Sequence, residues 1–209
     1  MKESRVVIII LLLSFVIYGG FYLSTRDIEI PENQAMPWQS YVNDQGETVV
    51  FDLTMGKSTL SDAMRLFGSE VEASLFEDKD KQQNLEVFFA STKVGGISAK
   101  VILNLNFNNY QFDYLSNNIK EIEVMPTGNK KTSFNKAGES SMFALTIKSL
   151  TFIPKADLSA DTLTSLFKKP VRIDLVDSRI EYWHYPDKGL RIIVDKENKE
   201  ILEFYNVEL

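Results

Sequence analysis

The sequence contains no cysteine, which excludes disulfide bonds, zinc–thiolate sites and cysteine nucleophiles. It also excludes the lipid-modified N-terminus of a bacterial lipoprotein, because that modification needs a cysteine at the cleavage site. If the domain is exported, it has no disulfides to stabilise it and must rely on its hydrophobic core. Hydrophobic residues make up 44% of the 209 residues and charged residues 25%, which is typical of a folded protein. The length is enough for one ordinary domain or two small ones.

Positive charge is in deficit, and it is not concentrated in a stripe. The formal net charge is −6 at pH 7. Binding to nucleic acid requires clustered lysine and arginine that neutralise phosphates. The one local cluster, Lys130, Lys131 and Lys136, lies in a stretch rich in Gly, Asn and Ser and is interpreted as a solvated loop. We therefore predict no nucleic-acid partner.

Catalytic and cofactor motifs are also missing. His184 is the only histidine, and neither a G-x-S-x-G motif nor a second histidine accompanies it. It is interpreted as a packed or edge residue of a strand. Residues 55–59 (MGKST) resemble the end of a phosphate-binding loop, but Phe51 occupies the position of the required first glycine. This segment is therefore interpreted as a helix N-terminus. The sequence predicts no enzyme activity, no cofactor, no metal and no nucleotide.

One long apolar run stands at the N-terminus. Residues 6–23 contain no charge and would span about 27 Å as a helix, enough for a bilayer core. Lys2 and Arg5 precede the run, so residues 1–5 are predicted to be cytoplasmic and the rest of the chain to lie outside. The alternative is a cleaved signal peptide, which has a shorter apolar region and a small-residue cleavage site. We favour a retained anchor in a bacterial inner membrane, with the bulk of the chain in the periplasm.

A polar segment, residues 24–48, follows the apolar run and is predicted to be a linker. Pro31, Pro37 and an NDQG turn at residues 43–46 interrupt it. Trp38 within this segment either packs back on the domain or lies at the lipid surface.

The remaining sequence repeats itself weakly, with an offset of one hundred residues. The matching pairs are Leu53 and Ile153, Leu66-Phe67 and Leu166-Phe167, Val71 and Val171, and Leu75 and Leu175. We predict two tandem units at residues 49–128 and 145–209, joined by a loop at residues 129–144. Whether the two units form one domain or two is left open by the sequence.

Each unit begins with a short amphipathic helix. In the first, Leu60, Ala63, Met64 and Phe67 form one apolar stripe. A capping box at Thr59 and Asp62 starts this helix and Gly68 ends it. In the second, the stripe is Ala160, Leu163, Leu166 and Phe167, and Pro170 follows. The segments after both helices alternate between apolar and polar residues, and one further strand is expected at residues 119–125. The predicted fold is α+β: a transmembrane helix, then two tandem units, each a short helix packed on an antiparallel β-meander.

A helix ending in Leu-Phe-Gly is followed by a charged strand and then by a hairpin with tyrosine, proline and glycine (Y-x-x-Y-P-x-x-G-L in this sequence). The residues that carry this pattern are Leu66, Phe67 and Gly68 in the first unit, and Tyr182, Tyr185, Pro186, Gly189, Leu190 and residues 192–195 in the second. This pattern resembles the small outer-membrane assembly lipoprotein family (SmpA/OmlA) and the tandem-repeat fold of the β-lactamase inhibitor protein. The resemblance implies an envelope protein whose sheets bind other proteins, without catalysis. The chain departs from the lipoproteins in lacking the lipid-bearing cysteine and in having a spanning anchor.

Three aromatic residues are the candidate binding site. Phe88 aligns with Trp183, and Tyr185 shares the strand face of Trp183. If Leu85, Val87, Ile180 and Tyr182 face the helices, these three aromatics form an exposed patch that marks a protein interface. The alternative is that the two sheets pack together, or that the loop at residues 129–141 covers the three rings.

The function expected from this pattern is that of an accessory or scaffolding subunit. It would join other membrane or envelope proteins in a complex through its sheet surfaces. The alternative is a module that binds a lipid or a small apolar ligand between helix and sheet.

Overall fold

The computed structural model describes residues 35–207, which belong to one compact unit, residues 34–209. The predicted cytoplasmic segment (1–5), the predicted anchor (6–23) and the first part of the predicted linker (24–48) lie outside the described residues. Within residues 35–207, none of the helices has the length and apolarity needed to span a bilayer.

The described residues confirm the α+β class with antiparallel strands. Four α-helices are present in this part of the chain: α2 (Leu60–Phe67), α3 (Asn109–Ser116), α4 (Lys136–Ser141) and α5 (Ala160–Phe167). A small sheet is formed by β1 (Tyr41–Val42), β2 (Thr48–Val50) and β3 (Leu53–Thr54).

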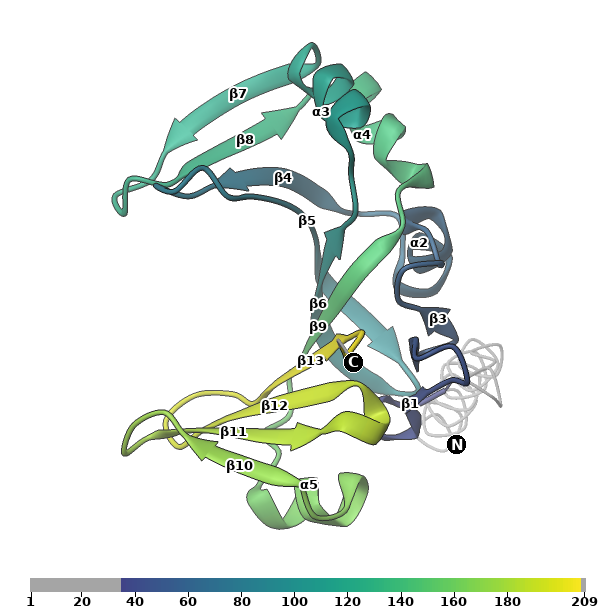
Figure 1. The fold of residues 1–209 in the computed structure, drawn as a ribbon, viewed down its shortest axis with the longest axis vertical. Coiled ribbons are helices and arrows are strands. Elements are labelled where there is room, and N and C mark those ends of the chain that lie inside the picture. The colour runs from purple at the N-terminus through teal and green to yellow at the C-terminus, as the bar shows by residue number, and fades with distance from the viewer. Residues whose placement is uncertain (1–34, 208–209) are drawn as a thin grey trace, which may run out of the picture. The chain divides into compact units, whose positions relative to one another are not determined.

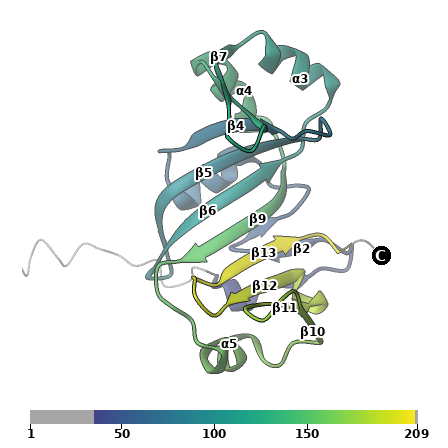
Figure 2. The same cartoon turned by 90° about the vertical axis from the view of Figure 1, so that its left-hand side faces the viewer.

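A ten-stranded sheet forms the body of the unit, in the order β10-β11-β12-β13-β9-β6-β5-β4-β8-β7. Its strands are β4 (Glu72–Glu77), β5 (Gln83–Val94), β6 (Ile97–Leu105), β7 (Ile119–Val124), β8 (Lys130–Phe134), β9 (Ile147–Pro154), β10 (Arg172–Leu175), β11 (Ile180–Tyr185), β12 (Leu190–Asp195) and β13 (Ile201–Tyr205). Figure 1 shows that this sheet is strongly curved, and Figure 2 shows its strands lying in front of α2. The β6–β9 pair joins the two sequence halves, so both share one continuous sheet.

The predicted helix boundaries are confirmed. The Thr59 N–H donates to Oδ2 of Asp62 (2.8 Å), and Oγ1 of Thr59 accepts from the Asp62 N–H (3.3 Å), which is the predicted capping box of α2. Gly68 ends α2 with φ +105°. In α5, Oγ of Ser159 accepts from the Thr162 N–H (3.2 Å).

A cluster of phenylalanine rings occupies the middle of the core. The ring centroid of Phe51, in the turn before β3, lies 5.8 Å from Phe67 of α2, 5.2 Å from Phe152 of β9 and 6.4 Å from Phe204 of β13. All four residues are buried. Helix α2, the small sheet and both halves of the large sheet therefore share one core. The described residues thus form one domain and not two.

The expectation of a loop at residues 129–144 is wrong. This segment contains β8, α4 and a 3₁₀ turn at Met142–Ala144. Thr132 and Phe134 alternate with polar residues and are buried, so β8 packs between β4 and β7. Oδ1 of Asn135 accepts from the N–H groups of Ala137 and Gly138 (both 3.0 Å) and caps α4.

The described end of the expected linker is also structured. A 3₁₀ turn (Pro37–Gln39) and β1 lie within it, and the ring of Trp38 meets that of Phe167 edge-on at 6.5 Å. Trp38 thus packs back on the domain, one of the two alternatives for this residue. The expected strand at 119–125 is confirmed as β7.

Candidate functional site: the open face of the ten-stranded sheet

The two faces of the large sheet have different surroundings. On one face, Phe89 of β5 packs against Phe67 of α2 (centroids 5.5 Å apart), and Tyr185 of β11 packs against Phe167 of α5 (6.0 Å). The side chains of the other face point away from these two helices, and we call this side the open face. It is defined by Glu72 of β4, Glu86 and Phe88 of β5, Ile102 and Asn104 of β6, Ser149 and Thr151 of β9, Arg172 and Asp174 of β10, Tyr182 and His184 of β11, Arg191 of β12, and Glu203 and Tyr205 of β13.

Strand register places open-face side chains in rows across the sheet. One row runs without interruption through eight strands as Arg172, His184, Arg191, Glu203, Thr151, Ile102, Phe88 and Glu72. Side chains directly opposite each other on neighbouring strands are in contact distance. The row therefore presents one band that is charged at the β10–β13 end and apolar near β5 and β6.

Arg191 is held in this band by three neighbouring side chains. Its Nε donates a 2.7 Å hydrogen bond to Oε2 of Glu203, and its guanidinium carbon lies 4.8 Å from the ring centroid of Tyr182 and 6.0 Å from that of Tyr205. Burial lowers the pKa of Arg191, but the hydrogen bond and charge of Glu203 outweigh it and raise the pKa. An arginine held between two tyrosine rings and a carboxylate is a pre-organised recognition group.

His184 belongs to this band and lies in β11, as expected for a strand histidine. Its Nε2 is 2.9 Å from Oδ2 of Asp174, and the same oxygen is 3.0 Å from Nη2 of Arg172. One carboxylate oxygen thus engages both neighbouring side chains. The three groups form a charged cluster next to β10.

The middle of the open face carries an unused acceptor. Asn104 donates from Nδ2 to Oγ of Ser149 (2.9 Å), while its buried Oδ1 accepts no hydrogen bond from residues 35–207. Its cross-strand partner is Glu86. Burial raises the pKa of the Glu86 carboxyl, and the hydrogen bond from Asn84 opposes this shift. The Asn104 Oδ1 acceptor thus lies beside a half-buried carboxyl that accepts one hydrogen bond, from Asn84 (2.8 Å), so the position suits a donor from outside.

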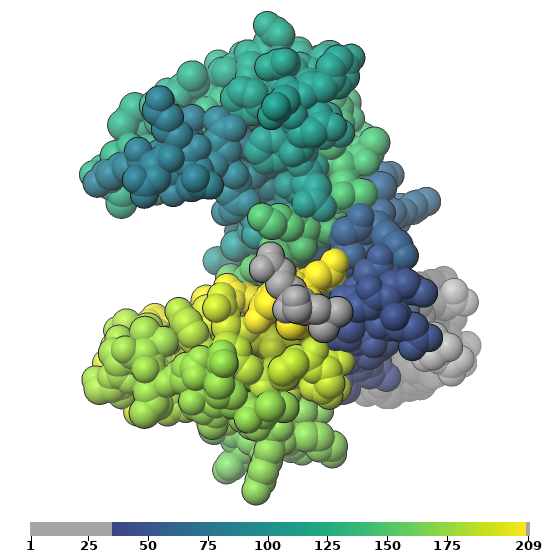
Figure 3. Space-filling view, viewed as in Figure 1, coloured from purple at the N-terminus to yellow at the C-terminus, as the bar shows by residue number. Residues whose placement is uncertain are grey.

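A groove of about 680 Å³ lies on this face and is open to solvent. Figure 3 shows the surface hollowed between the part of the sheet containing β4, β5, β7 and β8 and the part containing β10 to β13. The groove is lined by Gly56, Asn104, Asn106, Lys148, Ser149, Thr151, Arg191, Glu203, Tyr205, Asn206 and Val207. The lining side chains are predominantly polar.

The expected aromatic patch is wrong for two of its three members. Trp183 and Tyr185 are 7% and 1% exposed and lie on the helix-covered face. The Tyr185 hydroxyl donates to the Lys168 carbonyl (3.2 Å), and burial raises its pKa to about 12, with a smaller contribution from the charge of Asp187. Phe88 lies on the opposite, open face, where it is half-buried. The predicted inner position of Tyr182 is corrected at the same time, because this residue lies on the open face.

Helix α5, and not a second sheet or the 129–141 segment, covers the ring of Tyr185. The α5 residue Phe167 packs directly on Tyr185, and the end of α5 supplies the carbonyl that Tyr185 binds. Both strand faces in residues 180–185 carry large side chains, so alternation alone gives no preference between them.

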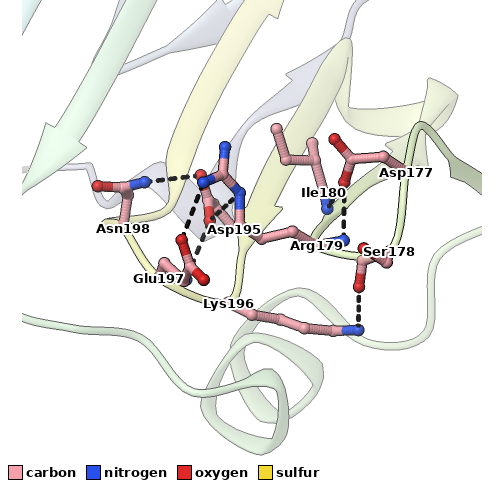
Figure 4. A network of polar contacts seen from close by, with 8 residues as sticks. All are labelled: Asp177, Ser178, Arg179, Ile180, Asp195, Lys196, Glu197 and Asn198. Carbon is pink, nitrogen blue, oxygen red and sulfur yellow. Dashed lines mark hydrogen bonds and ion pairs between the residues drawn. The ribbon is translucent and has the colours of Figure 1, made fainter.

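The hairpin ends beside the site are held by a polar network (Figure 4). Nη1 of Arg179 donates to Oε2 of Glu197 (2.9 Å), and its Nε lies 3.4 Å from Oδ1 of Asp195. Oδ1 of Asp177 accepts from the N–H groups of Arg179 and Ile180 (2.7 and 2.8 Å), which lowers the pKa of this carboxyl. The carboxylates of this network are engaged by the arginine and by backbone N–H groups. Within residues 35–207, no cluster of three or more histidine, aspartate or glutamate side chains is arranged to hold a metal ion.

Sequence reasoning missed the main residues of the open face, namely Arg191, Glu203, Tyr205 and Asn104. A signal for two of them exists in residues 201–205 (ILEFY), where Leu202 and Phe204 alternate with Glu203 and Tyr205. No sequence pattern indicates that β13 lies beside β9, which is what gathers these side chains in one place.

Comparison of the chain with protein-family models, with curated proteins and with solved structures finds no match.

Proposed function

We propose that this chain is a non-enzymatic, membrane-anchored protein of the bacterial envelope that binds another protein through the open face of its sheet. In this proposal residues 6–23 hold the chain in the inner membrane and the unit at residues 34–209 lies in the periplasm. The chain acts as an accessory or scaffolding subunit of a membrane-associated complex.

The open face is the observation that carries this proposal. Tyrosine and arginine dominate the energetic centres of protein interfaces because they offer large, rigid contact surfaces. Arg191 between Tyr182 and Tyr205 supplies this chemistry in a fixed geometry. The hydrogen bond from Arg191 to Glu203 limits the side-chain entropy that binding would otherwise cost.

The acceptor pair at Asn104 and Glu86 narrows the chemistry of the partner. Oδ1 of Asn104 is buried without a donor, and Glu86 is a half-buried carboxyl on the adjacent strand. A lysine, arginine or backbone N–H of the partner would satisfy both groups. We therefore propose that the partner places a hydrogen-bond donor over this position.

The tandem-unit interpretation belongs to the same proposal. Residues 60–105 and 160–205 both run from an eight-residue helix into consecutive antiparallel strands. This common order supports a duplicated unit similar to that of the SmpA/OmlA and β-lactamase-inhibitor-protein families. It also supports sheet-mediated protein binding, which the resemblance implies.

The alternative, an apolar ligand held between helix and sheet, has less support. Leu60, Ala63 and Phe67 of α2 are at most 5% exposed and pack with the core. The open-face groove is lined mainly by polar side chains. A lipid or small apolar ligand would need an enlarged apolar cavity instead.

Affinity purification of the full-length chain from mild-detergent membranes tests the proposal. Wild type is compared with Arg191→Ala, and with Arg65→Ala as the matched control, since Arg65 is an exposed arginine on α2. Quantitative mass spectrometry should find a stoichiometric envelope protein with wild type and Arg65→Ala that Arg191→Ala loses. A partner retained equally by all three, or recovery of the chain alone with bound lipid, contradicts the proposal.

A further inference from the structure

Strand β10 carries an unusual amount of exposed apolar surface for the end of a sheet. Val171, Ile173, Leu175 and Val176 are 74%, 47%, 74% and 51% exposed. Ile173 and Leu175 share one face of the strand because side chains alternate, while Val171 and Val176 flank the strand at its two ends. Within the described residues, β10 is the last strand at this end of the sheet and pairs with β11 alone (Figure 1). Such an edge is a template for a further strand.

The corresponding strand of the first half lacks this exposure. In β4, Ala73 and Leu75 are 8% and 7% exposed, whereas Ile173 and Leu175, one hundred residues later, are 47% and 74% exposed. The difference follows from topology: β4 pairs with β5 on one side and with β8 on the other. The position that β8 occupies beside β4 has no counterpart beside β10 among residues 35–207. In β4 this outer edge is paired with β8, whereas in β10 the corresponding edge is open among residues 35–207.

The sequence of β10 is self-complementary in an antiparallel pairing. When Ile173 is placed opposite Ile173 of a second copy, Arg172 stands opposite Asp174 in both directions. The face that carries Arg172 and Asp174 then contains two oppositely charged cross-strand pairs, and the other face contains Ile173 and Leu175 of both copies. Opposite charges and apolar pairs at such positions both stabilise a sheet.

The backbone of β10 is oriented for this pairing. The Val176 N–H donates to the Ile180 carbonyl on β11 (3.0 Å), so Val176 faces β11. Because successive residues of an antiparallel strand face opposite sides, Ile173 and Leu175 direct their N–H and C=O groups away from β11. Just before the strand, the Val171 N–H donates to the His184 carbonyl on β11 (2.9 Å), so the edge available for pairing begins after Val171. Ile173 is thus in the orientation required at the centre of a two-fold pair.

We propose that a second copy of this chain binds along β10, with β10 strands antiparallel about a two-fold axis at Ile173. The interface is isologous, so the same residues contribute from both copies and the assembly closes as a dimer. The two large sheets become one continuous sheet. The proposal is independent of the partner-binding role proposed for the open face.

The opposite end of the sheet does not offer the same match. Strand β7 also exposes apolar residues, with Ile122 at 54% and Val124 at 67%. Pairing two β7 strands about Glu121 or about Ile122 places glutamates opposite each other, Glu121 with Glu121 or Glu121 with Glu123. Like charges directly opposite are destabilising, which favours β10 as the dimer edge.

Site-directed disulfide formation tests the axis, because the natural chain has no cysteine. Full-length Ile173→Cys in detergent is oxidised and compared with Ile122→Cys, an exposed isoleucine on the other edge strand. Directly opposite residues of an antiparallel pair lie within the Cα separation that a disulfide needs. We expect covalent dimers from Ile173→Cys and monomers from Ile122→Cys. Failure of Ile173→Cys to cross-link, or cross-links between the two variants in a mixture, overturns the proposal.

Charge exchange provides the second test, read out as dimer dissociation by analytical ultracentrifugation. Arg172→Asp alone and Asp174→Arg alone each place like charges opposite each other twice per dimer, and each should raise the dissociation constant about tenfold or more. The double variant Arg172→Asp/Asp174→Arg restores both opposite-charge pairs and should restore dimerisation. Circular dichroism checks that each variant is folded. A wild type of monomer mass, or a double variant no tighter than the folded single variants, contradicts the two-fold pairing.

Discussion

The backbone N–H of Thr48 donates a 2.8 Å hydrogen bond to Oδ1 of Asn206, although 158 residues separate the two in the chain. The amide of Asn206 also donates to the Met55 carbonyl (3.1 Å), and Oγ1 of Thr48 donates to the Tyr205 carbonyl (2.7 Å). Asn206 thus connects β2 and the residue after β3 in the small sheet to the end of β13 in the ten-stranded sheet. Thr48 is fully buried, so water gives its N–H no substitute partner.

We expect Asn206→Ala to lower the free energy of unfolding by about 1–3 kcal/mol, because it leaves a buried N–H without an acceptor. Thermal denaturation of the full-length chain, followed by tryptophan fluorescence, measures this change. Asn109→Ala, at an exposed position in α3, is the control and should change stability by less than about 0.5 kcal/mol. Equal melting temperatures for the two variants would show that the Thr48–Asn206 contact contributes nothing.

Phe88 and Trp183 occupy aligned positions in the sequence but lie on opposite faces of the sheet. Replacing each by alanine should therefore have different effects. Trp183→Ala removes a side chain that is 93% buried and should destabilise the fold by about 3–5 kcal/mol. Phe88→Ala, on the open face, should cost markedly less stability while weakening partner capture. Denaturant titration and the affinity purification described above measure the two effects. The assignment of Trp183 to the core fails if Trp183→Ala unfolds at the same denaturant concentration as wild type.

Thr59→Ala should destabilise the chain by about 0.5–2 kcal/mol, because it removes the N-cap hydroxyl of α2. Thr59→Ser keeps the hydroxyl and should retain most of the stability. Melting temperatures of the three proteins at one pH are sufficient for the comparison. A serine variant as unstable as the alanine variant would assign the loss to the threonine methyl group instead.

Two glutamates on neighbouring strands should respond to pH in opposite directions. Burial raises the folded-state pKa of Glu86, so the charged form is unfavourable and stability falls as pH rises through the window above 4.5. Hydrogen bonds from Lys130 and Gln83 lower the folded-state pKa of Glu77, so its contribution is present above 4.5 and is lost as pH falls.

Accordingly, Glu86→Gln should raise the melting temperature at pH 7 and have a smaller effect at pH 4. Glu77→Gln should lower the melting temperature at pH 7 and also have a smaller effect at pH 4. Melting curves of both variants and wild type at the two pH values measure the signs. A decrease in melting temperature at pH 7 for Glu86→Gln would contradict the assigned burial.

Local sequence signals predicted α2 and α5, but neither α3 nor α4. The stripe from Leu60 to Phe67, with Thr59 before it and Gly68 after it, contains all the information that α2 needs. Helix caps and amphipathic periodicity are properties of neighbouring residues. For this reason they could be recognised without knowledge of the remaining chain.

The faces of β11 were assigned incorrectly because the deciding contacts are distant in sequence. Tyr182 and Tyr185 have similar side chains on opposite faces, and the strand alone gives no preference. Phe167 of α5 covers Tyr185, and Arg191 of β12 covers Tyr182. In the same way, β8 is short and polar, and it becomes a strand through its pairing with β4 and β7.

The position of β13 has a consequence for synthesis of the protein. Residues 201–205 form the last strand among residues 35–207, yet they lie between β12 and β9 inside the sheet. A stop codon after residue 200 would therefore divide the sheet into two pieces and leave β12 and β9 with unpaired backbone groups. Strands β10 to β12 cannot join the rest of the sheet until residues 201–205 have been synthesised. Until then, two open strand edges are exposed that a chaperone would need to protect.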